Sequence, residues 1–157
     1  MPHLTTHNRR ELLKRSAAVT ALLAGAGLLA PSAHAAWTQA AFEAKTLADA
    51  VKALGGAAAV ESKDVTLVAP EVAENGAVVQ IAIATALPNV KRLLLLVEKN
   101  PAALSAAFDV TDAVDASFTA RVKMGQSSNV MAVAMMGDGR VLFAQREVKV
   151  TLGGCGG

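Results

Sequence analysis

Short runs of alternating apolar and polar residues fill the chain from Val65 onward, and this pattern constrains the fold most. In one run, Phe118, Ala120, Val122 and Met124 alternate with Thr119, Arg121 and Lys123. Successive side chains of a β-strand point to opposite faces of a sheet, so such a run predicts a strand with one dry and one wet face. Six or seven such runs at short spacing predict a mostly β chain, folded as an antiparallel β-sandwich.

Two runs carry additional information. Residues 92–97 include four consecutive leucines and predict a strand that is buried on both faces. Glycines flank Asp138 between two runs and predict a hairpin, and Asn75-Gly76 predicts a turn. Residues 101–108 are expected to be a connection. The predicted strands are 65–69, 78–83, 92–97, a short one at 108–110, 118–124, 130–136 and 140–152.

A single helix is predicted at residues 37–54, before the strands begin. Its apolar residues fall on one stripe, and Gly55-Gly56 supplies the stop. We expect this helix to lie outside the sandwich. The strands at 92–97 and 130–136 supply more apolar surface than a small sandwich needs, which suggests that another subunit covers one sheet face. The stripe consists of Phe42, Leu47, Ala50, Val51 and Leu54.

Residues 1–35 have the features of a cleaved export signal. Arg9 and Arg10 precede an uncharged stretch rich in Ala, Leu and Gly, and Ala33-His34-Ala35 is typical of a cleavage site. The stretch is too short and too rich in glycine for a membrane span. The twin arginine resembles a Tat signal, although a Sec signal that contains two arginines is the alternative. We therefore expect a periplasmic protein, not a membrane protein.

Removal of this signal changes the chemistry that remains. The segment holds four of the 15 basic and one of the 13 acidic residues, so the mature chain has 11 − 12 = −1 net charge. This charge gives no reason to expect a nucleic-acid partner. All three histidines also lie in the segment, which leaves the mature chain without His or Tyr and with one Cys. Residues 36–152 are long enough for one domain.

The chain ends with Gly153-Gly154-Cys155-Gly156-Gly157. Glycine adopts many backbone conformations and buries nothing, so residues 153–157 predict a flexible, exposed arm. Five extended residues span at most about 17 Å. An unpaired cysteine in an oxidising compartment is usually paired, blocked or used, so Cys155 is the candidate site for a covalently carried group.

Several other interpretations remain open. Cys155 could be incidental to a mobile tail, or could form an intermolecular disulfide in a plain interaction module. A chain end in Gly-Gly also occurs in ubiquitin-like carriers that load sulfur on the terminal carboxyl, in the cytoplasm. An acidic pair, Asp112 and Asp115, offers a weak case for an enzyme.

Three methionines, Met131, Met135 and Met136, suggest a copper site, because thioethers suit Cu(I). In a strand, however, positions 131 and 135 share a face while 136 points away. With no histidine available, we interpret these residues as core or contact residues and expect no metal.

The last ten residues, 148–157, together with the twin arginine, resemble the SoxY family of sulfur carriers. The Gly-Gly-Cys-Gly-Gly ending carries most of this resemblance, and it extends over nearly all of the mature chain. Further similar stretches are 42–45, 69–76, 93–100 and 127–130.

The resemblance implies an immunoglobulin-like β-sandwich that pairs with a SoxZ-type β-subunit in the periplasmic thiosulfate-oxidation system. It implies that a c-type cytochrome joins thiosulfate to Cys155, that a hydrolase then releases sulfate, and that in some organisms a sulfane dehydrogenase oxidises the remaining sulfur. The chain itself would be a carrier without cofactor or catalytic activity. Gly153, Gly154, Gly156 and Gly157 would form the arm that enters narrow partner channels.

Overall fold

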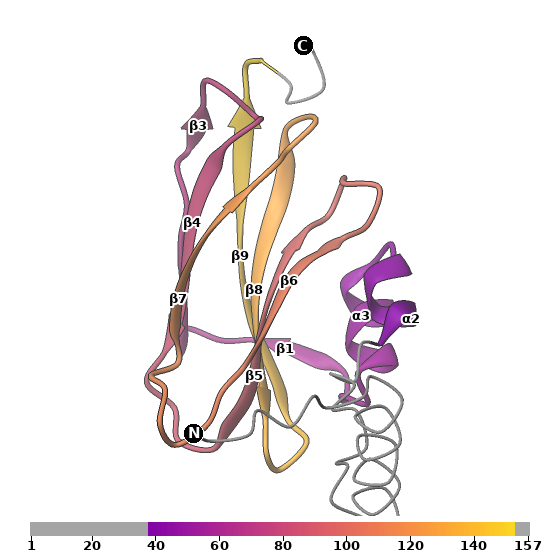
Figure 1. Cartoon of the computed structure of the whole chain (residues 1–157), viewed down its shortest axis with the longest axis vertical. Coiled ribbons are helices and arrows are strands. Elements are labelled where there is room, and N and C mark those ends of the chain that lie inside the picture. Colours follow the sequence, from indigo (N-terminus) through magenta and orange to yellow (C-terminus); the bar gives the residue numbers. More distant parts are fainter. Residues whose placement is uncertain (1–37, 153–157) are drawn as a thin grey trace, which may run out of the picture. The chain divides into compact units, whose positions relative to one another are not determined.

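Nine strands in two sheets lie within residues 38–152, the part of the chain that the computed structural model describes (Figure 1). The smaller sheet has the order β2 (Val65–Val68), β4 (Val79–Thr85), β7 (Ser117–Val122). The larger sheet has the order β1 (Ala59–Glu61), β9 (Val141–Val150), β8 (Ser128–Met136), β5 (Val90–Val97), β6 (Leu104–Asp109), and β3 (Val72–Ala73) also pairs with β9.

Antiparallel pairing joins all the long strands, and only the short β1 and β3 run parallel to β9. The prediction of a mostly β, immunoglobulin-like antiparallel β-sandwich is confirmed. The predicted hairpin is confirmed too: Met136 N–H donates to Arg140 O (2.9 Å), and Gly139 has a φ of +88°, a conformation that favours glycine.

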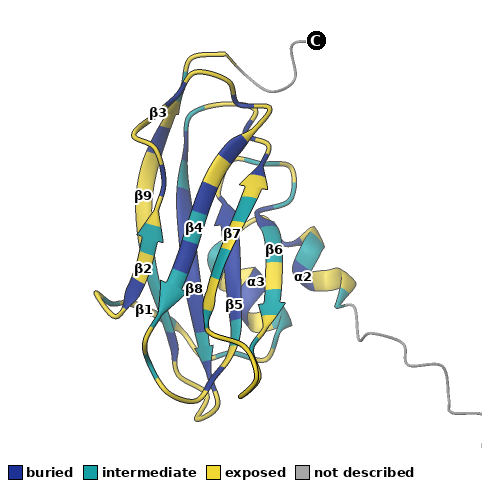
Figure 2. Cartoon of the chain, turned by 60° about the vertical axis from the view of Figure 1, so that its left-hand side comes forward, coloured by how far each residue is buried: buried dark blue, intermediate teal, exposed yellow. Residues whose placement is uncertain are grey.

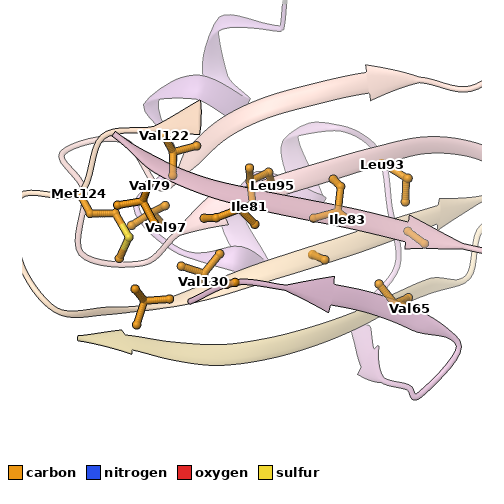
Figure 3. Packing of buried hydrophobic residues seen from close by; sticks show 14 of the residues in the cluster. Val65, Val79, Ile81, Ile83, Leu93, Leu95, Val97, Val122, Met124 and Val130 are labelled. Atoms are coloured by element: carbon orange, nitrogen blue, oxygen red, sulfur yellow. The ribbon is translucent and has the colours of Figure 1, made fainter. Parts of the chain in front are cut away.

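The main core lies between the two sheets (Figure 3). Ile81 and Ile83 of β4 face Leu93 and Leu95 of β5 across this space, and all four are at most 1% exposed. Figure 2 shows β5 and β8 buried along most of their length, whereas no residue of β7 before Val122 is fully buried. The central strands of the larger sheet are therefore covered on both faces.

A second core covers the other face of the larger sheet. It packs α2 (Gln39–Glu43) and α3 (Leu47–Ala53) against Leu94, Leu96 and Met131. The predicted two-sided burial of the leucine strand is confirmed, since Leu93 to Leu96 are all 0% exposed. The chain's own helices supply this cover, so the apolar surface of these strands is not by itself evidence of a partner subunit.

The prediction of one helix at 37–54 is wrong in its continuity. The chain is extended at Ala44 (φ −61°, ψ 138°), and Thr46 begins α3 by accepting a hydrogen bond from Asp49 N–H (3.1 Å). This N-cap favours a new helix start over continuation. The predicted stripe nevertheless packs as one side, in the second core. No helix within residues 38–152 is long and apolar enough to cross a membrane.

One strand prediction also needs correction, and two short strands were missed. Residues 104–108, expected to be part of a connection, belong to β6 and pair with β5. The short strands β1 and β3 were not predicted, because two or three residues carry no detectable alternation and their pairing with β9 comes from tertiary contact.

Candidate functional site

The predicted attachment site lies outside the described residues. Cys155 and its four flanking glycines follow Leu152, the last described residue, and Arg9 and Arg10 of the predicted export signal are also outside. The structure instead defines the base from which residues 153–157 extend, three residues before Cys155.

The last strand is anchored in both cores before it reaches this base, with Val141 in the core beneath the helices and Val148 in the core between the sheets. Val141 and Val148 are at most 2% exposed, and β9 pairs with β8 from Val141 as far as Val148, which lies opposite Ser128. β8 begins at Ser128 and offers no further strand partner. Two residues beyond Val148, the N–H of Val150 donates to the hydroxyl oxygen of Ser127 (2.9 Å). A serine side chain therefore extends the pairing of β9 on this side.

The other edge of β9 is held by the segment Glu71–Gly76, which contains β3. This segment runs parallel to β9, with Val72 opposite Lys149, and it follows β9 to its end. Four hydrogen bonds join this segment to residues 149–152. All four have a backbone oxygen as acceptor, and three of them also have a backbone N–H as donor. The hydrogen bonds are Lys149 N–H to Glu71 O (3.0 Å), Thr151 N–H to Ala73 O (3.1 Å), Thr151 Oγ1–H to Glu74 O (3.1 Å) and Gly76 N–H to Leu152 O (2.8 Å).

We call Glu71–Gly76 together with Ser127 the collar. The collar is fixed to the core: Ala73 is 7% exposed, and Gly76 O accepts a hydrogen bond from the N–H of the buried Met124 (2.7 Å). The predicted turn at Asn75-Gly76 is confirmed, with the Asn75 side chain accepting from Ala77 N–H (2.8 Å). Figure 1 shows β3 and the end of β9 at the same end of the sandwich. The collar is thus a fixed structure around the end of β9.

Sequence reasoning missed the collar, although one signal pointed to it. The stretches 69–76 and 127–130 were among those that resemble the SoxY family, but they lie about 50 residues apart in the chain. The fold brings both against the last residues of β9. No local pattern marks Ser127 or Thr151 as hydrogen-bonding partners at this place.

The surface beside the collar carries balanced charge. A shallow hollow there is lined by two acidic and two basic residues, all exposed. Such a mixture creates little net attraction for an anion or a cation. Within residues 38–152, no three His, Cys, Asp or Glu side chains are grouped to hold a metal ion. The lining residues are Glu71, Arg146, Glu147 and Lys149.

The methionines lie in the cores, as interpreted. Met131 and Met135 pack in the core beneath the helices, whereas Met136 lies in the core between the sheets. Met131 and Met136 are 5% and 6% exposed. The prediction that Met131 and Met135 share one face of the strand while Met136 lies on the other is confirmed. The three sulfur atoms therefore do not converge on one site.

Asp112 and Asp115, the pair considered for an enzyme, are exposed and lie away from the collar. They line a hollow together with Thr85, where β4 ends, whereas β4 begins just after the collar. The two carboxylates are therefore at the opposite end of the sandwich and form no part of the candidate site.

One carboxyl is perturbed, at the β8–β9 turn. The Arg140 side chain donates to Asp138 (Nε to Oδ2, 2.7 Å), and so does its backbone N–H (3.0 Å). These hydrogen bonds favour the charged carboxylate and hold the pKa of Asp138 below its ordinary value. The turn is at the far end of β9 from the collar, so this group belongs to the fold and not to the site.

Comparison with known proteins gives a family match and several similar structures. The profile described as "Sulfur oxidation protein SoxY" matches residues 50–155, a range that includes the collar and Cys155. The structure of the sulfur carrier protein SoxY from Chlorobium limicola is similar, with 32% identity and a TM-score of 0.58, covering 65% of this chain and 92% of that one. No curated protein sequence matches.

A superoxide reductase (neelaredoxin) from Ignicoccus hospitalis shares the fold alone. It has 18% identity and a TM-score of 0.50, covering 55% of this chain and 78% of that one. The profile match, by contrast, spans more than half of the 157 residues and reaches the predicted attachment cysteine. The chain therefore belongs to the SoxY family of sulfur oxidation proteins.

Proposed function

We propose that the protein carries the sulfur intermediates of thiosulfate oxidation covalently on Cys155. Membership of the SoxY family supports a sulfur-carrier role in sulfur oxidation. The observation that carries the finer proposal is the placement of the chain's one cysteine three residues beyond Leu152, the last residue that the collar holds. A carrier of this kind needs a firm base and an accessible thiol.

Loading is an oxidation. The Cys155 thiol and the outer sulfur of thiosulfate form an S–S bond, giving Cys–S–S–SO3−, with the release of one proton and two electrons. A c-type cytochrome takes up the electrons. The described residues bring no cationic cluster to the end of β9, so activation of the thiol falls to this partner enzyme.

Unloading follows by hydrolysis. Water attacks the terminal sulfonate, the bond between the sulfane sulfur and the sulfonate breaks, and sulfate leaves with two protons, while a persulfide stays on Cys155. A hydrolase performs this step, and a sulfane dehydrogenase, where one is present, oxidises the remaining sulfur. The chain itself is a substrate carrier and not an enzyme. Because glycine has no side chain, Gly153, Gly154, Gly156 and Gly157 allow the arm to enter narrow channels.

The proposed setting is the periplasm. Export by the Tat pathway, directed by Arg9 and Arg10, carries folded cargo and would allow a SoxZ-type β-subunit without its own signal to cross in the same complex. This pairing is expected from the family.

An intact-mass spectrum of the mature protein tests the proposal. The protein is purified from thiosulfate-grown cells and measured before and after thiol reduction, with the Cys155→Ser variant as the control. Thiosulfonate or sulfane adducts that map to Cys155, disappear on reduction and are absent from the variant would support a carrier. An unmodified thiol, or only a disulfide-linked dimer, would favour the interaction module instead.

A further inference from the structure

The two residues that follow β9 are held in place although they bury little surface. Thr151 is exposed and Leu152 is 69% exposed, so apolar burial does not fix them. The collar does so by hydrogen bonds, and the last of these, from Gly76 N–H to Leu152 O, is only 2.8 Å long. Exposed strand ends commonly fray, since little burial opposes their opening. Backbone order up to Leu152 therefore depends on the collar.

We infer that the collar positions the arm: it fixes the arm's origin at Leu152 and thereby sets how far Cys155 can reach. This inference rests on the proposed carrier function. Ser127 and Thr151 are positioning residues in this device, because their side chains supply hydrogen bonds that the strands themselves do not provide.

The reach follows from the chain lengths. With the collar closed, Cys155 is three residues from fixed backbone, which permits at most about 11 Å at 3.3–3.6 Å per residue. With the collar open, the fixed origin recedes to Val148, which is 0% exposed and paired with Ser128. Cys155 is then seven residues away, and the limit rises to about 25 Å.

A longer tether dilutes the thiol around its partner. The effective concentration of a tethered group falls roughly as the −3/2 power of tether length once the span is reached. The change from three residues to seven therefore lowers it about 3.6-fold, which is (7/3) raised to the power 3/2. Loading of Cys155 by a docked enzyme should slow by this factor, whereas reaction with a small free reagent should not.

The collar can be opened without damage to the core, since its bonds to β9 lie at the strand's edges and beyond Val148. Ser127→Ala removes the acceptor of Val150 N–H, and Thr151→Pro removes both hydrogen bonds donated by Thr151. Together they form the open-collar variant. The bond from Lys149 N–H to Glu71 O remains next to Val148, and the bond from Gly76 N–H to Leu152 O remains without its neighbours, so exchange at Gly76 reports whether Leu152 is released. Thr151→Val, which keeps the backbone N–H, is the intermediate step. Insertion of four glycines between Leu152 and Gly153 gives the matched control, with a closed collar and the same free length of seven residues.

Three measurements on the mature protein, purified with any subunit that accompanies it, test the inference. Amide hydrogen exchange at Val150 and at Gly76, whose N–H donates to Leu152 O, should accelerate about two- to tenfold for each hydrogen bond lost in the open-collar variant, while exchange at Val148 stays unchanged. Alkylation of Cys155 by iodoacetamide should proceed at the wild-type rate in all forms. The kcat/KM of thiosulfate loading by the c-type cytochrome should fall about three- to fourfold, equally in the open-collar variant and the four-glycine insertion.

The collar, its role in setting reach and the carrier function would each be refuted by a different result. Unchanged exchange at Val150 and Gly76 in the open-collar variant would refute the collar as the structure that holds residues 150–152. Faster exchange with wild-type loading kinetics would refute its role in setting reach, and so would a loading defect in the open-collar variant that the four-glycine insertion lacks. If wild-type Cys155 is not loaded at all, the carrier function fails, and the exchange data alone would then describe a collar without that role.

Discussion

Gly56 is the position where a single added methyl group should disturb the helix layer most. It follows α3, where its N–H donates to Val51 O (2.9 Å) and so holds the chain close to the sheet. A Cβ atom at this position would lie 2.7 Å from Val51 Cγ1, 2.9 Å from Met135 Cε and 2.9 Å from Val141 Cγ2. Gly56→Ala therefore creates three close contacts at once.

The size of the effect follows from which neighbours can move. Carbon atoms pack at about 3.5–4.0 Å, so each neighbour must shift by roughly 0.6–1.3 Å. Met135 Cε ends a flexible side chain and can swing away, but Val51 and Val141 are 2% exposed and stiff at χ1. Overpacking of this kind costs about 1–3 kcal/mol. The lower entropy of the unfolded chain with alanine offsets about 0.4–1 kcal/mol, so the middle of the two ranges leaves a net loss of about 1.3 kcal/mol.

Urea and thermal unfolding of the mature protein measure this loss. The Tm should fall by about 5–10 °C, given about 4–8 °C per kcal/mol for a domain near this size. Gly55→Ala is the neighbouring control: Gly55 has a φ of +77° and no atom within 4 Å of the added Cβ, so any loss there reflects backbone strain alone. Sulfur loading per folded molecule should be unchanged, because α3 contributes no residue to the collar.

A double-mutant cycle separates the clash from other causes. Val51→Ala removes the nearest contacting methyl group, so Gly56→Ala should cost about 1 kcal/mol less in that background than in the wild-type chain. Strictly additive losses would refute the clash as the cause. So would a Gly56→Ala variant as stable as the wild type.

Three further outcomes are expected. Leu95→Ala, at a 0% exposed position between the sheets, should lower the free energy of unfolding by about 2–5 kcal/mol in urea melts, and a loss under 1 kcal/mol would contradict the packing described. Asp138 has a lowered pKa in the folded state, so its contribution to stability is present above the ordinary value of about 3.9 and is lost as pH falls through the folded-state pKa. The stability difference between wild type and Asp138→Asn should therefore shrink below about pH 4, and a pH-independent difference would refute the assignment. Gly154→Val should slow processing by the partner enzymes without changing the melting temperature, and unchanged processing would contradict a narrow channel.

Most of the sandwich could be predicted because its strands carry their own signal. Alternation in β7 and the four leucines of β5 reflect one-sided and two-sided burial, and both forms of burial are found. The helix prediction shows the limit of periodicity. The stripe was right and the continuity wrong, because the N-cap at Thr46 outweighed the apolar spacing.

Only part of the candidate site could likewise be predicted from the sequence. The glycine-flanked Cys155 could be identified from the sequence alone, since residue type and position carry the chemistry. The collar could not, because its contacts join residues 71–76 to residues 149–152 through tertiary pairing. Neither the two residues of β3 nor the hydroxyl of Ser127 has a local pattern that predicts a partner some 20 to 80 residues away.

The pairing of β9 on both sides also has a mechanical consequence. β9 is hydrogen-bonded to β8 along one edge and to β1 and the collar along the other, with bonds that run across the strand. A pull on the chain end along the strand axis therefore loads many bonds in shear at once, instead of peeling them apart one by one. An enzyme that draws the cysteine into its channel would act against the most resistant direction of the carrier, so the tension would extend the arm before it unfolded the domain.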